Sequence, residues 1–187
     1  EFSASGTGKD FLVMPKIGLN FNDLDSNTNP KSGEKFGASL GVGTGSATFG
    51  QADANYKKYI PLSNDKKWVM SLGVSGGVQA GNVPYYEKYN SFNTTSVYGR
   101  ASDGKERDTY YAVGSANLKY NVWGPVSLIA GTTVGGIGHN MSDLGVGGGV
   151  EVNLMGIPIS VTAGARYNPI TKESGTAINV NILKLDF

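Results

Sequence analysis

The single histidine of the chain is the first candidate for chemistry. His139 stands three positions before Ser142, and Glu151 follows within the next alternating segment. A histidine base, a serine nucleophile and an acid are the three groups of a hydrolase triad. Ser142, however, lies in the turn-forming run "HNMSD", where a serine hydroxyl commonly stabilises a turn. We therefore interpret His139 as an exposed loop residue and predict no catalytic residue.

A second group of residues consists of charges inside segments that otherwise alternate apolar and small polar residues. These charges share the polar face of their segments: Lys16, Asp53, Lys119, Glu151 and Arg166. Isolated charges are unfavourable in an enclosed interior, so they should pair there. We predict a salt-bridged polar network, and a gated conduction path is the alternative.

Other kinds of site find little support. The glycine-rich stretches "GTGSATFG" and "GVGGGV" are followed by no helix pattern, so they do not predict a phosphate-binding loop. Cysteine is absent, no metal-ligand spacing occurs, and the net charge of +1 gives no basic surface for nucleic acid. We expect no cofactor, no metal and no nucleic-acid partner.

The elements that must position these residues are strands, because alternation with period two runs through nearly the whole chain. Eight alternating segments can be delimited: 11–21, 36–60, 68–78, 110–122, 126–134, 144–154, 159–167 and 177–187. Ten strands result if 36–60 splits and "YYEKYNSFNTTSVYG" also forms membrane strands. No apolar run reaches 18 residues, which excludes a transmembrane helix.

The composition of the two faces indicates which one meets lipid. The polar faces carry mostly Gly, Ser, Thr and Asn, whereas charges gather in loops such as "SNDKK" and "DGKERD". A solvated sheet surface would carry more charge. We therefore predict an all-β, membrane-spanning, antiparallel up-and-down barrel with its apolar face outward and aromatic residues at the strand ends. The predicted barrel covers 10–187, after a periplasmic segment 1–9, with external loops near 22–35, 82–108, 139–143 and 169–176.

The strand plan, the hairpin "YKKYIPLSNDKKWVMSLGVSGG" and the terminal "LKLDF" resemble the small eight-stranded outer-membrane proteins, the family of OmpA-type domains, OmpX and the opacity proteins. The resemblance implies a Gram-negative-type outer membrane, with lipid and lipopolysaccharide as surroundings. It also implies that Phe187 and Leu185 form a signal for the barrel-assembly machinery. Because some small outer-membrane barrels modify lipid A, an enzyme using His139 and Ser142 is a third functional hypothesis.

The longest interruption between segments carries five aromatic residues among balanced charges: Tyr85, Tyr86, Tyr89, Phe92 and Tyr98. Tyrosine combines apolar area with a hydrogen-bonding tip, and long loops commonly carry function. We predict a non-enzymatic surface protein whose external loops bind an extracellular or host ligand, or which has a membrane-structural role. A narrow channel for small solutes or ions is the second hypothesis.

Overall fold

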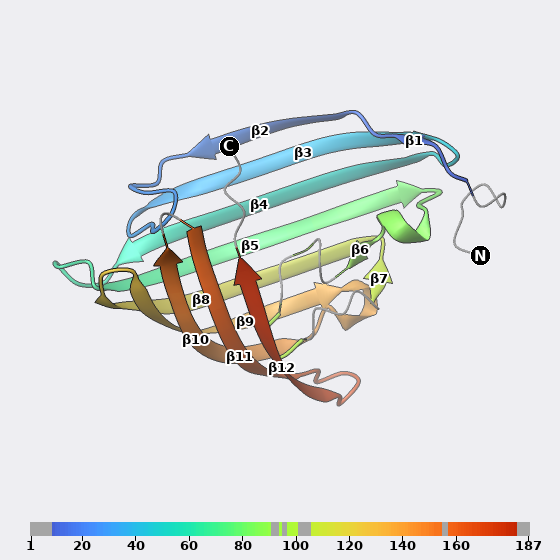
Figure 1. Ribbon diagram of the computed structural model, residues 1–187. Helices are drawn as coiled ribbons and strands as arrows, with labels where there is room; N and C mark the ends of the chain where they lie inside the picture. The colour runs from blue at the N-terminus through green and yellow to red at the C-terminus, as the bar shows by residue number, and fades with distance from the viewer. Residues whose placement is uncertain (1–8, 91–93, 95–96, 101–105, 155–156, 183–187) are drawn as a thin grey trace.

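The computed structural model describes residues 9–90, 94, 97–100, 106–154 and 157–182. They form one curved antiparallel sheet, a separate two-stranded ribbon and two short 3₁₀ helices (Figure 1). The sheet strands are β1 (Leu12–Val13), β2 (Lys16–Asn22), β3 (Gly33–Gly45), β4 (Phe49–Pro61), β5 (Trp68–Gly81), β8 (Tyr110–Trp123), β9 (Val126–Ile137), β10 (Leu144–Leu154), β11 (Ile157–Tyr167) and β12 (Ser174–Ile182). The ribbon pairs β6 (Tyr89–Asn90) with β7 (Arg107–Asp108), and the 3₁₀ helices are η1 (Tyr85–Glu87) and η2 (Gly138–Asn140).

The all-β, antiparallel prediction is confirmed, and so is the orientation of the two faces. Large apolar side chains lie exposed on the convex face, as Leu40 at 61% and Val146 at 57% illustrate. Their neighbours in sequence, such as Gly41 and Gly145, are buried on the concave face. Alternation places successive side chains on opposite faces of a strand. The protein therefore carries its apolar surface outside and its polar surface inside.

The segment 36–60 splits into two strands, β3 and β4, as the ten-strand alternative required, and a tight turn at 46–48 joins them. Gly45 adopts a φ of +127°, a conformation that favours glycine, where the chain reverses. The alternation pattern does not reveal this turn, because the hairpin pairs even-numbered residues with even-numbered ones, as Leu40 with Ala52. Both arms thus keep the same alternation phase, and the pattern continues through the turn without a break.

The sheet is open in the part of the chain that the structure describes, which corrects the predicted closed eight-stranded barrel. The strand order runs from β1 and β2, which both pair with β3, through β4, β5, β8, β9, β10 and β11 to β12. One edge of β2 and one edge of β12 carry no partner strand among the described residues. The segment 85–99, which could have supplied two further membrane strands, forms η1 and the short strand β6 in its described part, and β6 pairs with β7. The same described residues include no helix long and apolar enough to cross a membrane.

The division of 36–60 into β3 and β4 adds one strand to the predicted order, and this changes which connections lie at the same end of the sheet. The connection 23–32 lies beside the turn 62–67, since Lys66 Nζ is 3.7 Å from Asp25 Oδ2. The connections 82–109, 138–143 and 168–173 lie at the opposite end, because antiparallel strands alternate in direction. The segment 22–35 therefore does not share an end with the other three segments that were predicted as external loops.

Candidate functional site: the polar inner face and its two covers

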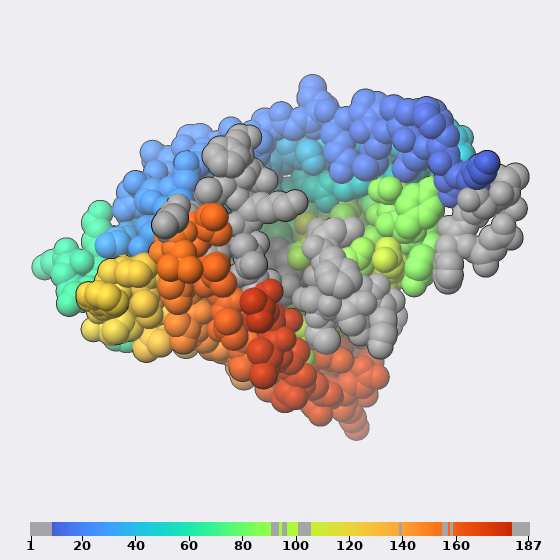
Figure 2. All heavy atoms as spheres, viewed as in Figure 1, coloured from blue at the N-terminus to red at the C-terminus, as the bar shows by residue number. Residues whose placement is uncertain are grey.

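The concave face is lined by polar side chains and covered at both ends by chain segments that fold over it. One cover is the connection 23–32, and the other is formed by 85–90 and 97–100. Figure 2 shows the hollow that the sheet encloses between the blue strands β2 and β3 and the orange strands β10 and β11. A cavity of about 380 Å³ lies between the covers and contacts Thr28 of the first cover and Tyr98 of the second.

The first cover is tied to an ion pair on the sheet. Lys119 on β8 pairs with Glu151 on β10, and their side chains are 15% and 16% exposed. The Lys119 ammonium also donates to Asn29 Oδ1 at 2.8 Å, and the Asn153 amide donates to the carbonyl of Thr28 at 3.2 Å. The sequence prediction that Lys119 and Glu151 face a common interior agrees with this geometry.

This ion pair gives a first testable expectation. Replacing Glu151 by Gln leaves the Lys119 ammonium largely buried without its acid, so we expect the free energy of unfolding to fall by about 2 kcal/mol. The variant K119Q/E151Q should lose less than the sum of the two single variants. Denaturant unfolding in detergent micelles measures both, with Lys58→Gln as control because its pair with Glu34 is about half exposed. If the loss in the double variant equals the sum of the two single losses, Lys119 and Glu151 do not stabilise each other.

The second cover is anchored by a buried charge cluster. Asp143, which is fully buried, accepts hydrogen bonds from Arg100 and from Arg166 Nη1, the latter at 3.3 Å. The Asn168 amide donates to the other Asp143 oxygen at 2.7 Å, and Arg100 also pairs with Glu106. Two guanidinium groups thus share one carboxylate, with a further carboxylate on Arg100. Charges with so little exposure persist only when they are paired and hydrogen-bonded.

Residues 97–100 lie flat against the inner wall. The Tyr98 amide donates to Thr133 Oγ1 at 3.0 Å, and its hydroxyl donates to Asn117 Oδ1 at 2.8 Å. Burial raises the pKa of the Tyr98 phenol above its ordinary value. On the opposite side, the Asn179 amide donates to the carbonyl of Arg100 at 3.2 Å. The segment therefore bridges β8 and β9 to β12 across the inner face.

Gly99 permits this close approach. Its φ is +76°, and a Cβ at this position would overlap the Ala165–Arg166 peptide and lie 2.7 Å from Ala165 Cα. Real Cβ atoms show no such distances to backbone atoms, so only glycine fits here without a shift of the chain.

Asp53 holds the β6 end of the second cover. The Tyr89 hydroxyl donates to Asp53 Oδ1 at 2.7 Å, and the Gln51 amide donates to Asp53 Oδ2 at the same distance. Burial and the neighbouring carboxylate raise the pKa of the Tyr89 phenol. The Tyr89 ring also packs edge-on against Tyr111, with centroids 4.7 Å apart. These contacts fix the ribbon against β4 and β8.

The predicted polar network is thus divided into separate clusters. Lys119 pairs with Glu151, Arg166 pairs with Asp143, and Asp53 binds the uncharged Tyr89 and Gln51. Lys16 lies on the inner phase of β2 and is exposed. Sequence reasoning missed Asp143, Arg100 and Glu106, because all three stand in connections, where charges are ordinarily solvated.

The aromatic residues predicted as a contact surface fall into two groups, one exposed and one on the inner face. Tyr85 and Tyr86 are 46% and 38% exposed, and the Tyr85 ring lies 4.9 Å from the Arg107 guanidinium. Tyr89 and Tyr98 instead point to the inner face. Three predicted residues, Phe92, Leu185 and Phe187, lie outside the described residues, as does the side chain of His139. Surface binding through Tyr85 and Tyr86 stays a prediction.

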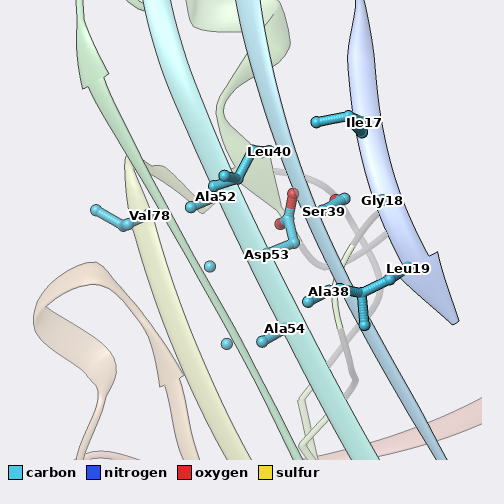
Figure 3. Close-up of a pocket in the computed structure, with 12 residues that line it drawn as sticks. Ile17, Gly18, Leu19, Ala38, Ser39, Leu40, Ala52, Asp53, Ala54 and Val78 are labelled. Atoms are coloured by element: carbon cyan, nitrogen blue, oxygen red, sulfur yellow. The ribbon is translucent and has the colours of Figure 1, made fainter. Parts of the chain in front are cut away.

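A depression of about 810 Å³ lies on the convex face. Figure 3 shows the short side chains of Ala38, Ala52 and Ala54 on β3 and β4, beside the larger side chains of Leu40 and Val78 that also line the depression. Alanine and glycine occupy directly paired positions across β3, β4 and β5, since Ala38 pairs with Ala54 and Ala54 with Gly76. The depression is therefore a gap between larger apolar side chains on the outward face.

The family comparison corrects the resemblance to the OmpA, OmpX and opacity families. The Omp85 superfamily domain matches residues 1–137, which extend from the N-terminus to the end of β9. A match of this length over a chain of 187 residues indicates association with the bacterial outer membrane and overturns the assignment to the small eight-stranded barrels. The chain belongs to the Omp85 superfamily.

Proposed function

We propose that this protein is a membrane-embedded sheet of the bacterial outer membrane that assists the biogenesis of other outer-membrane proteins. One observation carries the proposal: the sheet has an apolar outward face and, in its described part, two edges without a partner strand. Unpaired backbone groups are strongly unfavourable in lipid, and an edge strand is a template for pairing with another chain. An incoming β-strand would satisfy these groups, and membership in the Omp85 superfamily supports this role.

Cross-linking in cells tests the proposal. The chain has no cysteine, so a cysteine introduced at Val180 on the edge strand β12 is the only one. We expect oxidation to give disulfide adducts with an outer-membrane precursor that carries a single cysteine in its terminal strand. Leu118→Cys is the matched control, because Leu118 also faces outward but lies on β8 between two partner strands. No adduct at Val180, or equal adducts at both positions, would refute pairing at this edge.

The covered inner face favours a second candidate, a narrow passage for small solutes. Its cavity is lined by polar groups such as Asn117 and Thr162, and the two covers close it at opposite ends. In this hypothesis the second cover is the gate, and the hydrogen bonds of Tyr98 to Thr133 and Asn117 hold it closed.

A further inference from the structure

We propose that Lys35 and Lys57 form a binding site for a phosphate-type oxyanion on the inner face. Lys35 on β3 and Lys57 on β4 are directly paired in the register of the two strands. Both stand on the inward phase, between outward residues such as Phe36 and Tyr56. Like charges directly opposite each other on neighbouring strands are destabilising. Lys35 is exposed and Lys57 is half-buried, and a bound anion would offset the repulsion between their two ammonium groups.

No carboxylate in the described part of the chain supplies that charge. The four carboxylates of the inner face bind other groups: Asp53, Glu106, Asp143 and Glu151. The Lys57 ammonium lies 5.2 Å from the centroid of the Tyr59 ring, a contact that orients the ammonium without neutralising it. Within the described residues, Lys35 and Lys57 have no ion-pair partner.

The space beside the lysines is shaped for a small ligand. Two cavities, of about 380 and 370 Å³, are both lined by Lys35, Lys57 and Ser115. Gly73 stands between Lys57 and Ser115 in the same row of paired residues, so no side chain fills the gap between the ammonium and the hydroxyl. A Cβ at Gly73 would lie 2.8 Å from Ser115 Oγ. The missing side chain leaves ammonium and hydroxyl donors facing one space.

These donors suit a compact oxyanion with more than one negative oxygen. Two lysine ammonium groups act as point charges toward phosphate, and a serine hydroxyl donates one further hydrogen bond. The ligand would be inorganic phosphate or the phosphomonoester of a headgroup, because both present the same oxygens. The cavity volumes suit a group of this size rather than a polymer.

Phosphorus-31 NMR titration of the full chain in detergent tests the site, with inorganic phosphate and glycerol phosphate as separate probes. We expect saturable binding that weakens at least tenfold in K35Q/K57Q and is largely restored in K35R/K57R. Lys16→Gln is the matched control, since Lys16 also faces inward but lines neither cavity. Tighter binding of glycerol phosphate would identify a headgroup as the source, and equal binding would identify free phosphate. An unchanged affinity in K35Q/K57Q, or no saturable binding of either probe, would overturn the proposal.

Unfolding measurements give a second readout that needs no binding signal. Without phosphate, Lys35→Gln should unfold at higher denaturant concentration than the parent, because it removes the repulsion from Lys57. Saturating phosphate should stabilise the parent and leave K35Q/K57Q unaffected, since only the form that binds the ligand gains from it. A loss of stability in Lys35→Gln without phosphate would contradict the uncompensated pair.

Discussion

Asp143→Asn should lower the free energy of unfolding by 3 kcal/mol or more, at the level of about 3–5 kcal/mol that follows the loss of one partner from a buried ion pair. The Asp143 side chain is fully buried, and it forms ion pairs with Arg100 and Arg166. The substitution keeps the shape of the residue, removes its charge and replaces one acceptor oxygen by an NH2 donor, although Asp143 accepts hydrogen bonds at both oxygens. The Arg166 guanidinium, at 17% exposure, is then left without its acid.

Denaturant unfolding in detergent micelles measures this effect. Asp23→Asn is the control, because Asp23 is exposed and its backbone amide, not its side chain, bonds to Glu34. The control should change stability by less than about 0.5 kcal/mol. Adding Arg166→Met to Asp143→Asn should recover part of the loss, since it removes the stranded charge. Equal stabilities of D143N and D23N would show that the cluster does not hold the second cover.

Gly99→Ala should detach the second cover while leaving the sheet folded. The positive φ costs an alanine about 1–2 kcal/mol, and the overlap with the Ala165–Arg166 peptide adds about 1–3 kcal/mol. These penalties act against the hydrogen bonds of Tyr98 to Thr133 and Asn117 and against the ion pairs of Arg100. They therefore raise the population of molecules in which the segment has left the wall, and trypsin detects that population.

Trypsin provides the readout for this movement, because Arg100 is only 6% exposed when the segment is in place. We expect cleavage after Arg100, located by mass spectrometry, to be at least tenfold faster in G99A than in the parent. Gly50→Ala is the matched control, since a Cβ at Gly50 meets nothing within 4 Å. Planar-bilayer recordings of the same variants test the passage hypothesis: increased conductance in G99A alone would support a gate. Unchanged cleavage in G99A would show that the cover accommodates the methyl group.

The sequence predicted the faces of the sheet well because every strand reports its own orientation. Leu40 and Val146 lie outward and Asp53 and Glu151 lie inward, as their alternation phase requires. This information is local and needs no knowledge of the rest of the chain. The turn at 46–48 preserves the phase on both sides, so the alternation pattern left the split of 36–60 as an alternative and did not locate the turn.

The covers could not be predicted because they depend on contacts between distant segments. Nothing in the run around Tyr98 and Arg100 distinguishes a segment against the inner wall from one in solvent. Gly99 needs a positive φ, but a glycine in a loop is common. Asp143 likewise reads as a turn residue before a strand, and only the fold brings it to Arg100 and Asn168. Lys57 could have been found, because it shares the inward phase of Asp53, whereas Lys35 stood in the predicted external loop 22–35.

The number of strands in the open sheet determines whether an odd or an even number of added strands can close it with antiparallel pairing throughout. Counted from β2 to β12, nine successive strands alternate in direction, so the two edge strands run the same way. A single added strand pairs antiparallel with both edges, and so do the outer strands of a three-stranded insert. If a two-stranded hairpin is added instead, one of its strands must pair in parallel with an edge strand. Any all-antiparallel closure of this sheet therefore requires an odd number of strands beyond the nine counted among the described residues, which makes a lone β-strand the smallest segment that can complete it.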